Sequence, residues 1–216
     1  MSDIRTGEQK CPNCGRTSTL TVYSSVNVTL NPSLKEKIMD SSFFAWECPH
    51  CHQRYYLPIE FLYHDMKAKY MLFFYPQDIS ALAHQEAKPL PFSPERFNVG
   101  NYQFRQVHGL SRLQEKIRIL DAELDDVVIE MVKCATRVNN EALRTAEIHF
   151  LGKKDGMLEF SYRDAQNKQQ GRFTATTEAY THYQSVVTEY EDFTPPAEMF
   201  SEINEGWILE RIKRQG

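Results

Sequence analysis

Hydrophobic and polar positions alternate along much of the first quarter of the chain, which is typical of β-strands. Residues 19–30 alternate well enough for one long strand or a bulged hairpin. An Asn-Pro-Ser sequence then starts a short helix over residues 34–39, and residues 43–47 and 54–57 return to a strand pattern. We therefore expect an antiparallel β lobe that contains a short helical insertion.

The middle of the chain is rich in aromatic residues. Residues 69–75 predict a buried strand that ends at Pro76, and residues 101–107 alternate aromatic and polar positions, as an edge strand does. Between them, residues 87–98 contain three prolines, which predicts a loop. The dense apolar run at 70–75 is far shorter than the roughly 20 residues that a membrane-spanning helix requires.

The strongest helical pattern begins at Ser111. Its hydroxyl can cap the helix while Gln114, three residues later, reaches back in a capping box. We predict one long amphipathic helix over residues 111–135, packed on a sheet, on another helix or on a partner copy in a homo-oligomer. Its apolar stripe consists of residues that recur every three or four positions, namely Leu113, Ile117, Leu120, Leu124, Val127, Val128 and Met131.

The last third of the chain predicts a small α+β unit. Two apolar runs flank a Lys-Asp-Gly turn, which indicates a hairpin, and a strand, a helix and a shorter helix follow. The expected elements are a hairpin over 146–162, a third strand over 169–176, a helix over 178–191 capped by Thr177, and a short helix over 197–205 closed by Gly206.

Charge is spread evenly and is slightly acidic. The net charge is −4; residues 1–136 carry 15 Lys and Arg against 16 Asp and Glu, and residues 137–216 carry 10 against 13. A protein that binds nucleic-acid phosphates usually shows a basic domain or stripe, so this balance counts against that class. The polar N-terminus lacks the apolar stretch of a secretion signal, and we expect a soluble cytoplasmic protein, in which thiols stay reduced.

Four of the five cysteines form two matching cassettes. Cys11 and Cys14 flank Pro-Asn, and Cys48 and Cys51 flank Pro-His. Two such pairs supply the four thiolates of a tetrahedral zinc site. The two pairs are separated by 33 residues, whereas about 15–20 residues separate the pairs of an ordinary zinc ribbon. The longer separation predicts an elaborated ribbon with a folded insertion.

The turns that carry the cysteines have further requirements. A proline at the second position stiffens each turn, and Gly15 permits the positive φ at which the first turn bends away. His52 stands at the equivalent place in the second turn, where histidine tolerates that conformation. Four sulfur ligands leave no position for water or substrate, so we expect a structural Zn²⁺. Replacement of one cysteine by His50 or His52, and redox chemistry by either pair, are the weaker alternatives.

Acidic residues of the predicted helix suggest a different chemistry. Asp121 and Asp125 share one face, and with Glu115 they could serve a metal-dependent hydrolase. We expect Asp126 to point away from the apolar stripe, on a solvated face. Cys134, on the flank of the same helix, is expected to be a partly buried free thiol. No glycine-rich nucleotide-binding loop is present in the sequence.

The paired Cys-Pro-x-Cys motifs, this far apart and with an extended region between them, resemble the CpXC family of prokaryotic proteins. The similarity continues through residues 115–130, which are similar to the helix at the end of that domain, and it covers about residues 8–136. The resemblance implies a bound metal and no particular reaction. His52, where many such turns carry glycine, is a departure that concerns turn geometry more than ligand identity.

Together these observations predict an α+β fold with two domains. Residues 1–136 would form a zinc-ribbon-like antiparallel lobe with one long amphipathic helix, and residues 137–216 a smaller α+β domain. We expect a non-enzymatic binding or scaffold protein with protein partners and a structural Zn²⁺ on Cys11, Cys14, Cys48 and Cys51. A nucleic-acid-associated zinc protein and a metal-dependent hydrolase are the alternatives, and no catalytic residue is assigned.

Overall fold

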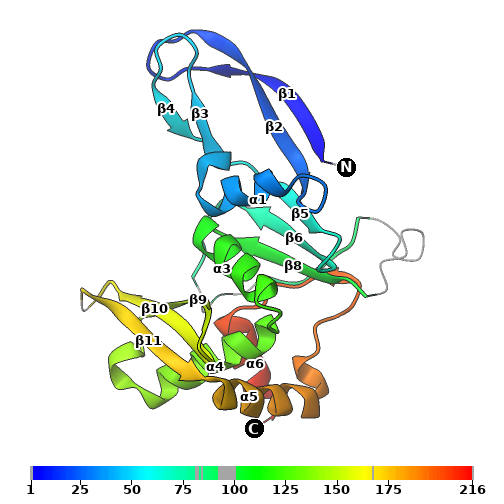
Figure 1. Ribbon diagram of the computed structural model, residues 1–216, viewed down its shortest axis with the longest axis vertical. Helices are drawn as coiled ribbons and strands as arrows, with labels where there is room; N and C mark the ends of the chain where they lie inside the picture. Colours follow the sequence, from blue (N-terminus) through cyan, green and yellow to red (C-terminus); the bar gives the residue numbers. More distant parts are fainter. Residues whose placement is uncertain (1, 81–82, 84, 92–100, 167, 216) are drawn as a thin grey trace.

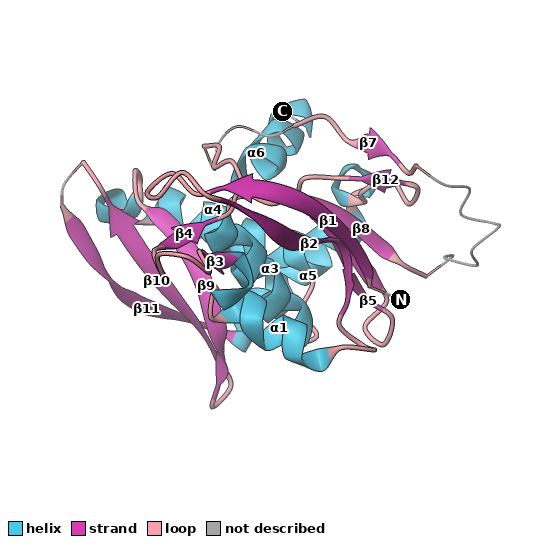
Figure 2. Ribbon diagram, turned by 90° about the horizontal axis from the view of Figure 1, so that it is seen from above, coloured by secondary structure: helices cyan, strands magenta, loops and turns pink. Residues whose placement is uncertain are grey.

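The computed structural model describes residues 2–80, 83, 85–91, 101–166 and 168–215. It is a mixed α+β structure in which two β-hairpins project from one end, as Figure 1 shows. Figure 2 shows helices α1 and α3 beside the five-stranded sheet, and α3 also contacts β9 of a separate three-stranded sheet. None of the helices in the described part of the chain is both long and apolar enough to cross a membrane.

The five-stranded sheet forms the first half of the molecule. Its strand order is β1-β2-β5-β6-β8, with β2/β5 and β6/β8 parallel and the other pairs antiparallel. The predicted strands at 69–75 and 101–107 are confirmed, and β8 lies at a sheet edge. The strands are β1 (Asp3–Lys10), β2 (Thr17–Asn27), β5 (Phe61–Asp65), β6 (Tyr70–Tyr75) and β8 (Gln103–His108).

Strand β1 was not expected from the sequence. Its eight residues are polar and almost all exposed, so they lack the alternation that marks a half-buried strand. Pairing with β2 supplies its order, because residues Ile4 to Lys10 face residues Tyr23 to Thr17 in a continuous antiparallel register. The predicted long strand at 19–30 is therefore one arm of a hairpin that ends at Asn27.

Helices cover the inner face of this sheet. α1 (Pro32–Met39) buries Leu34 and Ile38 and packs with Phe44 of the short 3₁₀ turn Ser42–Phe44. These side chains join those of β5, β6 and α3 in one apolar core. The second hairpin, β3 (Ala45–Glu47) and β4 (Arg54–Tyr56), continues directly from this core.

The predicted long helix is wrong: the structure has two helices, α3 (Leu110–Asp121) and α4 (Asp126–Asn139). Glu123 has φ of +55°, and its N–H donates to Leu120 O while the Leu124 N–H donates to Ile119 O. This pair of bonds is the Schellman arrangement that ends a helix, and Ile119 and Leu124 pack in the same apolar core. Asp125 then caps α4 by accepting from Val127 N at 2.8 Å.

The predicted capping box at the start of α3 is also wrong. The N-cap is Gly109, with φ of +84° and no side-chain bond. A Cβ at this position would lie 1.6 Å from Asp78 Oδ1, so glycine is required there. Gln114 instead donates to Ile38 O at 3.0 Å and to Met39 O at 3.1 Å, which ties α3 to the end of α1.

The three-stranded sheet agrees with the sequence prediction. Its order is β11-β10-β9, antiparallel throughout, and α5 covers one face with Thr176 as the N-cap, one residue before the predicted cap. Phe150, Phe160 and Tyr180 lie in its core with residues of α4. The elements are β9 (Glu147–Lys154), β10 (Met157–Asp164), β11 (Gln169–Thr176) and α5 (Thr177–Glu189), with short 3₁₀ turns at Glu141–Leu143 and Glu191–Phe193.

The end of the chain differs from the prediction of a helix over 197–205. β12 (Met199–Phe200) pairs with β7 (Lys88–Pro89), and α6 runs from Glu205 to Gln215. Asn204 fixes the start of α6, because its side chain accepts from Trp207 N at 2.9 Å. The predicted loop at 87–98 includes β7; residues 92–98 lie outside the described residues. The predicted boundary at 136/137 falls within α4, and the two-domain division stays a prediction.

Glycine at position 123 should stabilise the fold. Glu123 is exposed, and its left-handed backbone is unfavourable for a residue with a Cβ. We expect Glu123→Gly to raise the free energy of unfolding by about 0.5–1 kcal/mol, measured by chemical denaturation. Glu123→Ala is the control, because it removes the same charge and keeps the Cβ. Equal stabilisation by both variants would contradict the backbone explanation.

Candidate metal centre and a buried ion cluster

Each cysteine pair occupies the turn at the tip of a hairpin. The first turn connects β1 to β2, and the second connects β3 to β4. In the first, Cys11 N donates to Arg16 O at 2.9 Å and Gly15 N donates to Cys11 O at 2.9 Å. Gly15 has φ of +70°, as its position in the motif predicts.

The second turn repeats this pattern. Cys48 N donates to Gln53 O at 3.0 Å, and His52 N donates to Cys48 O at 2.9 Å. His52 has φ of +57°, so it adopts the conformation that Gly15 has in the first turn. The two Cys-Pro-x-Cys sequences therefore form two turns with equivalent backbone bonds.

The two turns bring all four sulfur atoms together. Cys11 Sγ lies 3.6 Å from Cys51 Sγ, and Cys14 Sγ lies 3.8 Å from Cys48 Sγ. Every ligand atom of the group is within 4.8 Å of every other. A tetrahedron of sulfurs about 2.3 Å from a central ion has edges of about 3.8 Å. The cluster is thus suited to a metal ion, and it is the only such group of three or more potential ligands in the described part of the chain.

Cysteines of the site lie in a small apolar cluster at the hairpin tips. Cys11 and Cys48 are buried, whereas Cys14 is exposed. Trp46 packs beside them, with its ring 5.8 Å from that of Tyr55. The fully buried part of this apolar cluster consists of Cys11, Trp46 and Cys48. Two of the three residues that stabilise the hairpin tips by burial are therefore cysteines of the site.

Hydrogen bonds prepare the cluster for a cation. Burial by itself raises the pKa of Cys11, but the backbone N–H groups of Cys14 and Asn13 outweigh it and lower that pKa to about 6. The pKa of Cys14 is raised to about 11: the N–H of Arg16 lowers it, but partial desolvation of the sulfur and the neighbouring cysteine sulfurs outweigh that bond. Four neighbouring thiols cannot all ionise without a positive charge among them, and a metal ion supplies that charge.

The structure separates Glu115 from the other two carboxylates that suggested a hydrolase, Asp121 and Asp125. Asp121 pairs with Lys35, and Asp125 caps α4. Both line a groove of about 570 Å³ that also contains Asp65. Glu115 lies elsewhere, in contact with Lys133, so the three proposed residues do not converge.

The prediction that Asp126 is solvated is wrong. Its carboxylate is fully buried and accepts from Arg105 Nε at 2.8 Å, Arg105 Nη2 at 2.9 Å and Lys116 Nζ at 2.8 Å. Burial would raise the pKa of Asp126, but the charges of Arg105 and Lys116 hold it well below its usual range. The helix is interrupted between α3 and α4. Asp126 is therefore the first residue of a new helix, and its side chain points to Arg105 and Lys116 and not to the solvent-facing side expected for one straight helix.

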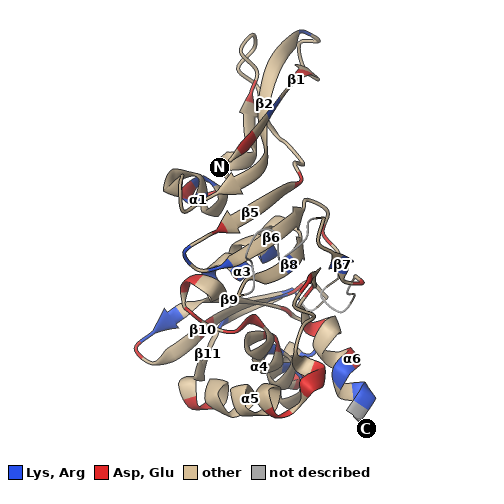
Figure 3. Cartoon of the chain, turned by 90° about the vertical axis from the view of Figure 1, so that its right-hand side faces the viewer, with Lys and Arg blue, Asp and Glu red and all other residues tan. Residues whose placement is uncertain are grey.

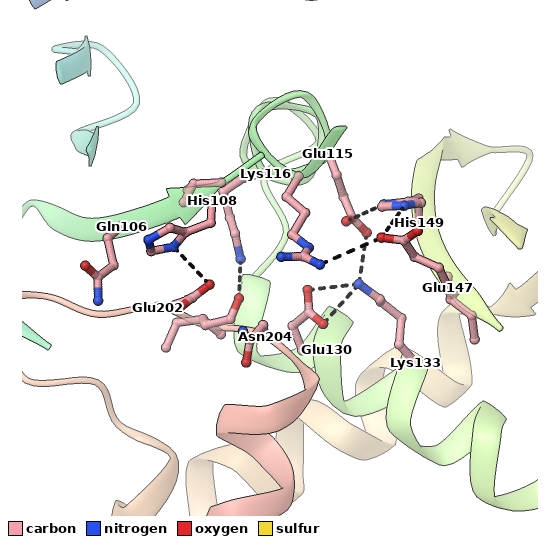
Figure 4. Close-up of a pocket in the computed structure, with 14 residues that line it drawn as sticks. Gln106, His108, Glu115, Lys116, Glu130, Lys133, Glu147, His149, Glu202 and Asn204 are labelled. Atoms are coloured by element: carbon pink, nitrogen blue, oxygen red, sulfur yellow. Dashed lines mark hydrogen bonds and ion pairs between the residues drawn. The ribbon is translucent and has the colours of Figure 1, made fainter. Parts of the chain in front are cut away.

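A second group of buried charges surrounds Lys133, as Figure 4 shows. Lys133 Nζ lies 3.2 Å from Glu115 Oε1 and 3.0 Å from Glu130 Oε2. Glu115 also accepts from Phe150 N at 2.7 Å and lies 3.0 Å from Nδ1 of His149. We call Glu115, Glu130, Lys133 and His149 the ion cluster. It borders a cavity of about 20 Å³, which has room for one water molecule.

The ion cluster was missed because its members come from three elements. Glu115 is on α3, Glu130 and Lys133 on α4, and His149 on β9. On a single helix such charges usually face water, and no short motif links them. Cys134, by contrast, was predicted to be a partly buried free thiol; the structure confirms the free thiol, which is buried and lies outside both groups.

Burial and ion pairing shift the pKa values of the residues in the ion cluster. Burial would raise the pKa of Glu115, but Lys133 and His149 lower it to about 2. Burial raises the pKa of Glu130 to about 7, against the effect of Lys133. Burial would lower the pKa of His149, but the hydrogen bond with the Glu115 carboxylate and the nearby carboxylate of Glu147 raise it to about 9. His149 is therefore charged at neutral pH.

This arrangement should make the chain less stable as pH rises. The native state binds the His149 proton more tightly than the unfolded state, whose histidine pKa is about 6.5, so this contribution is complete below about pH 6.5 and is lost through about pH 9. We expect a loss on the order of 1–3 kcal/mol over that range, measured by urea unfolding of the metal-loaded chain. His149→Asn should remove this part of the slope and His182→Asn should not; equal slopes in all three proteins would contradict the assignment.

Comparison with known proteins agrees with the motif. No curated protein and no solved structure matches the chain. The sequence model of the family described as CpXC protein matches residues 9–133, which include both cysteine turns, α3 and most of α4. That match covers more than half of the chain. The chain is therefore a member of the CpXC protein family.

Proposed function

We propose that this protein is a non-enzymatic, zinc-stabilised binding or scaffold protein in which one Zn²⁺ on Cys11, Cys14, Cys48 and Cys51 has a structural role. The observation that supports it is the close approach of the four sulfurs from two hairpin tips. Zinc is favoured because its structural sites are tetrahedral and commonly made of four cysteines. Four protein ligands also leave no open position for a substrate.

The role proposed for the ion is local. The apolar core of the first half lies around α1, α3 and strands β5, β6 and β8, away from the sulfurs. The hairpin tips have a much smaller core of their own, which is too little to hold two turns together without a ligand. Metal binding would supply that free energy, and the result would be an elaborated zinc ribbon.

A scaffold role is consistent with what the hairpins present. They project from the rest of the molecule (Figure 1), and Ile4 on β1 and Tyr56 on β4 are both about half exposed. Lys and Arg are interspersed with Asp and Glu along the chain, as Figure 3 shows, so a protein partner fits this surface better than nucleic acid does. A partner copy on residues 111–135 stays a prediction; the apolar stripe of these residues packs within the chain.

Metal removal should release the hairpin tips and leave the main cores folded. We expect the purified chain to contain one Zn²⁺, and chelation to abolish hydrogen-exchange protection in β3, β4 and the tip of the β1–β2 hairpin. Protection in β6 and α3 should change little, because their core does not include the cysteines. The measurements are metal analysis and hydrogen exchange by mass spectrometry.

Two serine variants provide the comparison. Cys48→Ser removes a buried sulfur of the cluster and should reproduce the effect of chelation. Cys134→Ser changes a buried cysteine outside the cluster and should keep both the metal and the protection. Metal-free chain with fully protected hairpin tips, or equal metal loss in the two variants, would overturn the proposal.

A further inference from the structure

The three-stranded sheet has one face that α5 does not cover. Its register places His149, Ser161 and Arg172 side by side in one row across the strands. The adjacent row contains Glu147, Arg163 and Gln170. Alternation along the strands puts both rows on the face opposite the core residues Phe150 and Phe160.

This face forms the floor of a groove. A hollow of about 530 Å³ lies over the two rows and reaches Ser111 at the start of α3. A second hollow of about 390 Å³ adjoins it at Glu147, beside Arg112 and Arg137. Volumes in this range are typical of sites for small molecules. We call the two hollows together the β9 groove.

The charge of the β9 groove differs from that of the whole chain. Its lining includes the side chains of Arg112, Arg137, Arg163, Arg172 and His149, against the two carboxylates of Asp78 and Glu147. Arg137 pairs with the buried Glu205 and His149 with the buried Glu115, so the excess positive charge comes from Arg112, Arg163 and Arg172. The chain as a whole has a net charge of −4. A local excess of positive charge in a concave site favours an anionic ligand.

Two of these cations are held in place by the protein framework. The His149 side chain is 21% exposed, and its Nδ1 lies 3.0 Å from the buried Glu115 carboxylate, which Lys133 and the Phe150 N–H also fix. Arg112 is 14% exposed and donates to the backbone oxygen of Ile79. Both cations are therefore positioned before any ligand arrives, which reduces the entropy cost of binding.

The carboxylate between them is held loosely. Glu147 is 49% exposed, and its Oε1 lies 3.5 Å from His149 Nε2 and 3.8 Å from Arg112 Nη2. Charge-assisted hydrogen bonds of this kind measure about 2.7–2.9 Å. Arg112 Nη1 is buried without a hydrogen-bond partner among the residues that the structure describes. Glu147 thus leaves donor capacity unused and has room to turn toward solvent.

We propose that the β9 groove binds a small phosphate monoester, whose phosphate group takes the place of the Glu147 carboxylate between Arg112 and His149. A phosphate offers three acceptor oxygens, enough for Arg112 Nη2 and His149 Nε2, the two atoms that face Glu147, and for a hydroxyl such as that of Ser161. Its double charge matches the additional arginines Arg163 and Arg172 better than a carboxylate does. The inference does not depend on zinc, because the cysteine cluster lies on the hairpin tips.

The test uses the full-length, metal-loaded chain in phosphate-free buffer, with glycerol 3-phosphate, inorganic phosphate and acetate as probes. Isothermal titration calorimetry should detect glycerol 3-phosphate and, more weakly, inorganic phosphate, and should detect no acetate binding at the same concentrations. Arg112→Gln should weaken glycerol 3-phosphate binding about tenfold, since a hydrogen bond to a charged group is lost. Lys153→Gln, the same charge change on β9 outside the groove, should have no effect.

A gain of affinity provides the sharper test. Glu147→Gln removes the internal competitor and should tighten glycerol 3-phosphate binding several-fold. Glu159→Gln makes the same charge change on the neighbouring strand β10, outside the groove, and should leave affinity unchanged. This pair tests the proposal even if Arg112→Gln does not fold.

Three outcomes would overturn the proposal. The first is absence of phosphate binding in both the wild type and Glu147→Gln. The second is an equal gain in Glu147→Gln and Glu159→Gln, which would reflect overall charge alone. The third is acetate binding as tight as that of glycerol 3-phosphate, which would show that the groove recognises carboxylates.

Discussion

The buried carboxylate of Asp126 joins the two halves of the molecule. It accepts three N–H bonds from Arg105 of β8 and Lys116 of α3, and Lys116 also donates to the backbone oxygen of Ile203 ahead of α6. Burying such charges is expensive, and only geometry that satisfies every partner offsets the cost. Removal of one partner of such a group costs about 3–5 kcal/mol, so these contacts fix how β8, α3, α4 and the C-terminal segment are arranged.

The cysteine cluster and the buried charges stabilise different parts of the chain. The charges lie among three apolar cores that contain residues from both halves of the sequence. The cysteines lie at hairpin tips with little apolar surface to bury. A ligand that binds only the folded tips stabilises those tips. Its binding free energy stabilises the rest of the chain only to the extent that the tips and the rest of the chain unfold together. The metal and the ion pairs are therefore separate constraints.

Sequence reasoning succeeded where a local rule decides the structure. The cysteine turns, the alternating strands β9 to β11 and the aromatic strand β6 all follow from short-range patterns. It failed where residues far apart in the sequence decide the structure. The apolar stripe continues across the break at Glu123, where no glycine marks the end of α3, and the polar strand β1 is ordered only by β2. Asp126 and Glu115 look like surface residues because their partners come from other elements.

The ion cluster gives the β9 groove a physical basis that surface arginines alone would not provide. Glu115 accepts from three donors, so its position is fixed and His149 is fixed with it. Glu147, half exposed at the start of β9, is then the part of the site that can move. An internal carboxylate that occupies the site for a fraction of the time weakens the apparent affinity by that fraction, without changing the contacts of the bound ligand. The side chain at position 147 would therefore set the ligand concentration at which the groove fills.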